Sequence, residues 1–334
     1  MRRVEIFKRR KTIVWFFTIC LILFILTNPI VWMLVGSNYF RTKIIEELVQ
    51  ETLASNLTRG LESETHKALA LFEFVDTHIF HYQRLPKSML NTSFLPYFIP
   101  GEAFCDEQAL ALMDLSDKVN ITASVIYLRG WDEISHHSVC GMYLEGAFRI
   151  FDPDYGYIFY DGDKIATFHD IQQKDNVWAE KLDAQKALNK TFDEQGYFRL
   201  YEPTFDYVVS NRNDKFHLGR MIREGIIKCY YSLFGNPFLV YLEDLYFRLS
   251  DTHPLLSARI EHLSGRFDAA LRDYASAIEE LKDPFLKSKA LFFRAQLFWD
   301  RGDYRKSISE FKNLLKLFPQ HKNREEIMFY LGNS

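Results

Sequence analysis

The sequence predicts an α+β protein with three parts: an N-terminal transmembrane helix, a domain that combines helices with an antiparallel sheet, and a C-terminal domain of helical repeats. Three observations support this fold class. An uncharged apolar run follows a basic N-terminus, short apolar runs separated by turn residues fill the middle of the chain, and a glycine–aromatic–proline pattern recurs near the C-terminus. A chain of 334 residues is long enough for two or three domains.

The N-terminal part carries the most distinct pattern. Residues 1–11 contain six lysines and arginines, and residues 12–36 contain no charged side chain. The run is longer than the apolar core of a signal peptide, and it can cross a hydrocarbon layer of about 30 Å. We therefore expect a single-pass anchor over 12–36, kinked at Asn28-Pro29. The tail over 1–11 is expected in the cytoplasm and the bulk of the chain in the periplasm or otherwise outside the cytoplasm. A buried helix of a soluble protein is the less favoured alternative.

Four further segments are expected after this anchor: a stalk helix over 37–60, a helix-and-sheet domain over 61–212, connecting helices over 213–254 and a repeat domain over 255–334. In the helix-and-sheet domain, apolar stripes predict a helix up to about residue 82 and a second over 105–118. Short apolar runs then alternate with turn signals, which is typical of an antiparallel meander. These turn signals stand at Gly130, Glu145-Gly146, Asp154-Tyr155-Gly156 and Asp161-Gly162.

The last part of the chain contains an internal repeat. "GRFDAALRDYASAIEELKDP" begins at Gly265 and "GDYRKSISEFKNLLKLFPQ" begins at Gly302, an offset of 37 residues (302 − 265). The recurrence of glycine, small residue, aromatic and proline in one order resembles the tetratricopeptide repeat, whose period is 34. By this resemblance we expect a concave surface that binds a protein or peptide segment. An ordinary bundle of helical hairpins is the alternative.

Composition narrows the classes of partner. Aromatic residues make up 16% of the chain, which favours packed domains over disorder. The net charge of −3 gives no sign of nucleic-acid binding. The four cysteines (Cys20, Cys105, Cys140 and Cys229) form no CxxC motif and no cluster with zinc spacing, so we expect neither a disulfide framework nor a metal site, and no cofactor. His78 and His81 have no third ligand at a suitable spacing, and we expect both on a helix face.

Cys105 is the candidate nucleophile. It stands directly before "DEQALALMDL", which reads as an amphipathic helix, so the thiol is expected at a helix N-terminus, where unpaired N–H groups and the macrodipole favour a thiolate. The charges of Asp106 and Glu107 would oppose thiolate formation if they faced the thiol. A buried, inert thiol is the alternative.

The candidate partners of Cys105 lie in "HHSVCGMYLEGAFRIFDPDYG". His137 begins one expected strand and Asp152 ends the next, 15 residues later (152 − 137). A hairpin turn at Glu145-Gly146 brings both to the same end of the two strands, where the carboxylate can hold one imidazole nitrogen and the other can face Cys105. His136 competes with His137, but neighbours on a strand point to opposite faces, and the spacing favours His137.

"CDEQA" at Cys105, "HSV" at His137 and "FDPDYG" at Asp152 resemble the transglutaminase-like superfamily, which has a papain-like core. The resemblance covers about residues 61–161. It implies that Cys105 is the nucleophile, His137 the general base and acid, and Asp152 the orienting carboxylate. Val139 stands where the family often has an aromatic residue, and Cys140 has no counterpart. Side chains for the oxyanion stay unassigned, with Gln83 and Asn91 as candidates.

The sequence therefore predicts a membrane-anchored thiol enzyme of bacterial type that acts on amide bonds, by hydrolysis of a peptide or isopeptide bond or by acyl transfer, with the repeats binding a partner or substrate. The alternative is a catalytically inactive scaffold or binding protein of the cell envelope with the same fold. Cys140 and Cys229 are expected to be core thiols.

Overall fold

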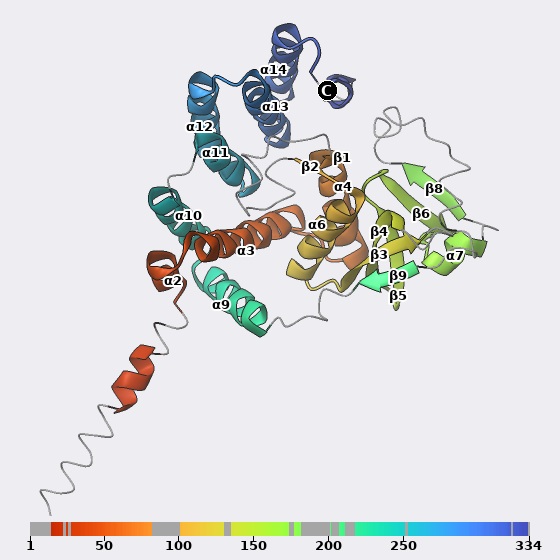
Figure 1. Cartoon of the computed structure of the whole chain (residues 1–334). Coiled ribbons are helices and arrows are strands. Elements are labelled where there is room, and N and C mark those ends of the chain that lie inside the picture. The colour runs from red at the N-terminus through yellow and green to blue at the C-terminus, as the bar shows by residue number, and fades with distance from the viewer. Residues whose placement is uncertain are drawn as a thin grey trace, which may run out of the picture. The chain divides into compact units, whose positions relative to one another are not determined.

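The computed structural model describes residues 15–22, 25, 28–81, 101–129, 135–173, 177–181, 201, 207–210, 218–250, 253–321 and 323–332. Over these residues the chain is mostly helical, with a small antiparallel sheet (Figure 1). Its contacts divide it into two compact units, one made of Met1–Leu48 and Phe216–Thr252, the other of Val49–Lys215 and His253–Ser334.

The first unit is helical. It contains α2 (Pro29–Val35), the first half of α3 (Asn38–Leu57), α9 (Leu218–Phe234) and α10 (Asn236–Ser250). The N-terminus of α2 is capped by Asn28, whose Oδ1 accepts the Ile30 N–H at 2.9 Å, and Pro29 occupies the first helical position. The helix ends at Gly36 after seven residues, and the Arg41 side chain donates to the carbonyl of Met33 at 2.7 Å.

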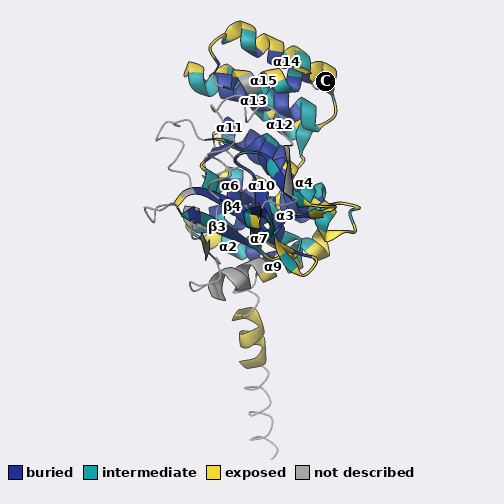
Figure 2. Ribbon diagram, turned by 90° about the vertical axis from the view of Figure 1, so that its right-hand side faces the viewer, coloured by how far each residue is buried: buried dark blue, intermediate teal, exposed yellow. Residues whose placement is uncertain are grey.

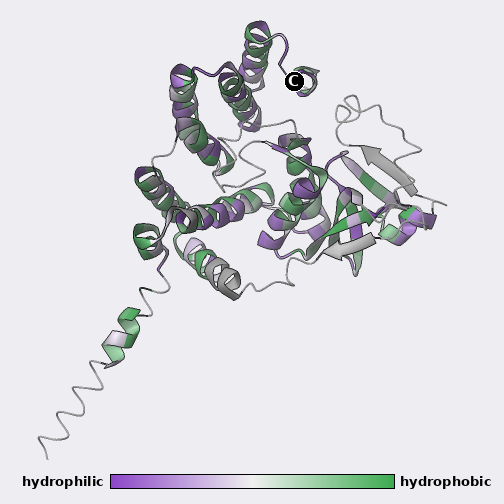
Figure 3. Ribbon diagram, in the orientation of Figure 1, coloured by the Kyte–Doolittle hydropathy of each residue, from purple (hydrophilic) through white to green (hydrophobic). Residues whose placement is uncertain are grey.

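The predicted transmembrane helix over 12–36 is wrong. No helix in the described part of the chain is both long and apolar enough to span a bilayer. Residues 15–22 are helical, hydrophobic (Figure 3) and exposed (Figure 2), but Asn28 and Pro29 begin a separate helix. At 1.5 Å per residue that helix is only about 10 Å long. Its apolar Met33 is fully buried, so part of the apolar run packs against protein. The prediction that the chain binds a membrane through a helix over 12–36 is therefore wrong as well.

The second unit begins with the second half of α3 and contains the sheet. Its other helices before the repeats are α4 (Glu64–His78), α6 (Cys105–Lys118) and α7 (Phe168–Gln173). Its strands are β1 (Phe80–His81), β2 (Glu102–Ala103), β3 (Ala123–Arg129), β4 (Ser135–Leu144), β5 (Ala147–Asp152), β6 (Tyr157–Asp161), β7 (Lys164–Ile165), β8 (Val177–Lys181) and β9 (Tyr207–Ser210). β1 and β2 pair in parallel, and the others form one antiparallel sheet in the order β7-β6-β5-β4-β3-β9, with β8 also on β6.

The sheet is held by apolar packing with α4, α6 and α7. Phe72 on α4 lies against Phe151 on β5, with ring centroids 5.6 Å apart. The Ser116 hydroxyl of α6 contacts the Met142 sulfur of β4 at 3.5 Å. A separate cluster joins the sheet to α7 and consists of Ile126, Leu128, Val139, Ile150, Phe159, Ala166, Phe168, Ile171 and Tyr201. These contacts anchor α6, whose first residue is Cys105, to the strands that carry His137 and Asp152.

The C-terminal helices form hairpins that repeat one pattern. They are α11 (Pro254–Leu263), α12 (Phe267–Glu280), α13 (Pro284–Asp300), α14 (Tyr304–Leu317) and α15 (Arg324–Gly332). Gly265, between α11 and α12, and Gly302, between α13 and α14, lie at the corresponding turns with φ +78° and +79°. In both turns the next residue donates its N–H to a carbonyl five positions back, which is the Schellman arrangement. Ala270 and Ser307, at the 37-residue offset, are both fully buried, as are Tyr274 and Phe311.

Candidate active site around Cys105

Cys105 is the first residue of α6. Phe104 precedes it in an extended conformation, and the Phe104 N–H donates to the Glu107 carboxylate at 2.9 Å, which fixes the start of the helix. The first N–H groups of an α-helix have no acceptor within the helix, so this end of α6 offers hydrogen-bond donors to a nearby anionic group. The thiol is half-buried, whereas Phe104 is 47% exposed. The nucleophile candidate therefore lies where a solvent-borne group can approach it.

His137 and Asp152 meet across the β4–β5 hairpin. The turn is at Glu145 and Gly146, and Cys140 pairs with Phe151. Continuing this register places Asp152 opposite the residue two positions after His137, so the two side chains are diagonal neighbours. His137 Nε2 lies 2.6 Å from Asp152 Oδ2, and the two side chains are 3% and 0% exposed.

The Cys105 side chain lies close enough to the imidazole of His137 to contribute to the pKa of that ring. Because Asp152 holds Nε2, the ring nitrogen left for the thiol is Nδ1. Burial alone lowers the pKa of His137, but the charge and hydrogen bond of Asp152, the side chain of Cys105 and the charge of Asp154 raise this pKa to about 10. An imidazolium beside a thiol favours the thiolate. The structure thus brings Cys105, His137 and Asp152 together at one site.

The turn after β5 fixes the carboxylate of Asp152. Its Oδ1 accepts the N–H of Asp154 at 3.2 Å and the N–H of Tyr155 at 3.1 Å. Since Oδ2 contacts His137, both carboxylate oxygens form hydrogen bonds. The Tyr155 ring packs edge-on against the His137 imidazole, with centroids 4.9 Å apart. The "DPDYG" stretch is therefore a turn that holds the acid and the imidazole in place.

Gly156 closes this turn at φ +69°, and a Cβ there would lie 2.6 Å from Oδ1 of the buried Asp76. We expect Gly156→Ala to lower the free energy of unfolding by about 1–3 kcal/mol through backbone strain and this clash. Gly162→Ala is the matched control, since Gly162 has φ +64° but open space around its Cβ position. Urea unfolding of both variants measures the difference. Equal losses would show that the contact with Asp76 contributes nothing.

A second carboxylate–imidazole pair adjoins the site and was missed by the sequence analysis. His81 Nδ1 lies 2.7 Å from Asp154 Oδ1, which also accepts from the Gln108 side chain at 2.9 Å. The prediction that His78 and His81 share a helix face was wrong, because α4 ends at His78 and His81 belongs to β1. The two partners are 73 residues apart, and no spacing in the sequence indicates the contact.

The other candidate residues lie elsewhere. Cys140 is fully buried, and burial, followed by the charge of Asp117, raises the pKa of its thiol far above the usual range, so it is unreactive. The expectation of a core thiol is wrong for Cys229, which is exposed. Within the residues the structure describes, no cluster of His, Cys, Asp or Glu could hold a metal ion. Gln83, Asn91 and the side chain of His136 lie outside the described residues.

No family model, curated protein or solved structure matches the chain. Its function is therefore inferred from the geometry of this site and the chemistry of its residues.

Proposed function

We propose that the chain is a transglutaminase-like thiol enzyme that acts on amide bonds, by hydrolysis or by transfer of the acyl group to an amine. The observation that supports this most is the proximity of Cys105 to the hydrogen-bonded pair of His137 and Asp152. A nucleophile, a proton carrier and a group that orients the carrier are what acyl transfer through a covalent intermediate requires. In this proposal Cys105 is the nucleophile, His137 the general acid and base, and Asp152 the orienting carboxylate.

The reaction has two balanced steps. The Cys105 thiolate attacks the carbonyl carbon of the amide, the C–N bond breaks, and the His137 imidazolium gives its proton to the departing amine. This step leaves a thioester on Cys105 and a neutral imidazole. In the second step His137 takes a proton from water or from an incoming amine, which attacks the thioester. The acid or new amide leaves, and Cys105 is again a thiolate beside an imidazolium.

The start of α6 suits the charge that develops on the substrate oxygen. The N–H groups of its first turn point out of the helix end, and the helix dipole favours negative charge there. Tyr127 on β3 lies close enough that the charges of Asp106 and Cys105 contribute, after burial, to raising the pKa of its hydroxyl. A neutral phenol beside the thiol can donate a hydrogen bond without adding negative charge.

The rate of alkylation by iodoacetamide tests this proposal. Cys105, with His137 as its proton carrier, should react with iodoacetamide about tenfold faster or more than an exposed thiol that has no such neighbour. The exposed Cys229 provides an internal standard in the same chain, and the buried Cys140 should stay unmodified until the protein unfolds. Mass spectrometry of peptides sampled over time gives the rate at each cysteine. His137→Ala should reduce the rate at Cys105 to that at Cys229.

Equal rates at Cys105 and Cys229 in the unmodified chain would contradict the enzymatic proposal. That result would instead support a catalytically idle binding module with the same fold. If only Cys105 reacts rapidly, the next step is to capture compounds from extracts as covalent adducts of Cys105. Mass spectrometry of these adducts then identifies the acyl group that the site accepts.

A further inference from the structure

The helical repeats hold the segment that leads into Cys105. β1 and β2 form a short parallel ribbon in which Phe80 lies opposite Glu102, and the Phe80 N–H donates to the Gly101 carbonyl at 2.9 Å. Only Phe104 separates this ribbon from Cys105. A displacement of the ribbon is therefore passed directly to the thiol.

The ribbon is buried against α13 of the repeats. Lys289 Nζ lies 2.8 Å from Glu102 Oε1, and the two side chains are 3% and 2% exposed. Phe292, less than one turn further along α13, meets Phe80 edge to face with ring centroids 5.9 Å apart. Phe80 is also part of the hydrophobic cluster formed by the repeat helices. A buried charge pair and an aromatic contact thus bind both strands of the ribbon to one helix.

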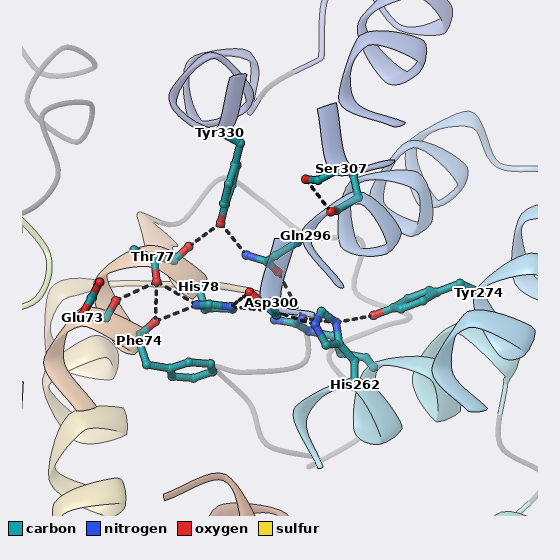
Figure 4. A network of polar contacts seen from close by, with 12 residues as sticks. Glu73, Phe74, Thr77, His78, His262, Tyr274, Gln296, Asp300, Ser307 and Tyr330 are labelled. Atoms are coloured by element: carbon teal, nitrogen blue, oxygen red, sulfur yellow. Dashed lines mark hydrogen bonds and ion pairs between the residues drawn. The ribbon is translucent and has the colours of Figure 1, made fainter. Parts of the chain in front are cut away.

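A polar network holds the end of α4, immediately before the ribbon (Figure 4). His78 Nε2 lies 3.0 Å from Asp300 Oδ2, and His262 Nε2 contacts the same oxygen at 2.8 Å. The Tyr330 hydroxyl donates to the Thr77 carbonyl at 3.1 Å. His262 belongs to α11, Asp300 to α13 and Tyr330 to α15. The contacts therefore come from alternate helices, which line one face in a stack of hairpins.

We propose that the repeat face made by α11, α13 and α15 is a docking surface for this chain's own segment, the end of α4 and the ribbon, and that it positions Cys105 beside His137. Lys289 is the principal positioning residue. The inference rests on the proposed function for the role of Cys105. Removal of the Lys289 ammonium takes away a buried positive charge beside Glu102, so Glu102 and the ribbon shift toward water. The contacts of this face with Phe80, Glu102, His78 and Thr77 all involve the chain's own segment.

Lys289→Met in the full-length chain tests the proposal. We expect it to slow the alkylation of Cys105 at least tenfold relative to Cys229 in the same sample, and to speed amide hydrogen exchange over residues 101–107. Arg294→Met is the matched control on the same helix, because Arg294 pairs with Glu310 inside the repeats at 2.7 Å. It should change both readouts less than twofold.

Two further variants keep the test decisive. The charge exchange Glu102→Lys with Lys289→Glu should restore most of the lost rate. If Lys289→Met does not fold, as judged by circular dichroism, Glu102→Gln is used in its place. It should likewise slow the alkylation of Cys105 and speed amide exchange over residues 101–107. A folded Lys289→Met chain with unchanged alkylation and unchanged exchange would overturn the proposal. If Cys105 is no more reactive than Cys229 in the unmodified chain while exchange still rises in Lys289→Met, the positioning stands and the catalytic function fails.

Discussion

Replacing His137 by alanine is expected to slow the turnover of p-nitrophenyl acetate at Cys105 about 10²–10⁴-fold, the range typical for loss of general acid–base catalysis. In the unmodified chain the Cys105 sulfur attacks the ester carbonyl, p-nitrophenolate leaves, and a thioester forms. Because the leaving group is coloured, the first turnover appears as a burst of one p-nitrophenolate per chain. The test requires no knowledge of the natural amide substrate.

The size of the effect follows from the geometry at His137. Its imidazole forms a hydrogen bond with Asp152 and lies near Cys105, and its cationic form is stabilised by the carboxylate. Removal of the ring takes away the cation that favours the thiolate and the base that deprotonates water in the second step. Both steps therefore slow together.

Three controls separate catalysis from loss of structure. Cys105→Ala should abolish the burst, and Cys229→Ser should leave it unchanged. The combined Cys105→Ala and His137→Ala chain should be no slower than Cys105→Ala alone, because residues that act as a unit are not additive. A full burst at the unmodified rate in folded His137→Ala would show that the imidazole takes no part in the chemistry.

The proximity of His137 and Asp152 could be predicted from the sequence because it depends on local geometry. A two-residue turn at Glu145 and Gly146 fixes the register of β4 and β5, and the register fixes which side chains are neighbours. The position of Cys105 at a helix N-terminus is equally local, since it depends on the apolar period of the residues that follow.

The contacts that support this site could not be predicted in the same way. The pairs His81–Asp154 and Glu102–Lys289 join segments far apart in the chain, and each depends on how the elements pack. Charged residues in such pairs look like ordinary surface residues in the sequence.

The error at the N-terminus has a different origin. The apolar run over 12–36 is long enough to predict a membrane span, but the side chain of Asn28 caps a new helix within that run. Met33 then packs in the interior of a helical unit, where an apolar side chain is as favourable as it is in a bilayer. Hydropathy alone does not distinguish these two environments, whereas the Asn28-Pro29 pair is a helix-start signal.

The charge state of His137 gives the second large expected effect. With ¹⁵N-labelled histidine, the ring of His137 should stay cationic through neutral pH and lose its proton as the pH approaches about 10. In Asp152→Asn the charge that raises the pKa of His137 is gone, and burial becomes the dominant effect. The pKa of His137 should therefore fall below that of an exposed histidine. A ring that is neutral at pH 7 in the unmodified chain would contradict the ion pair with Asp152.

Stability should follow the same titration. The pKa of His137 is higher in the folded chain than the value of about 6.5 in the unfolded chain, so the folded state binds the proton more tightly. The resulting stabilisation is complete below about pH 6.5 and is lost as the pH rises through about 10. Asp152→Asn should therefore cost about 3–5 kcal/mol of unfolding free energy near pH 6, the range for breaking a buried ion pair, and much less near pH 10. Urea unfolding at both pH values measures this difference. A cost that does not vary with pH would mean that Asp152 acts through its hydrogen bonds to the Asp154 and Tyr155 N–H groups and not through its charge on the imidazole.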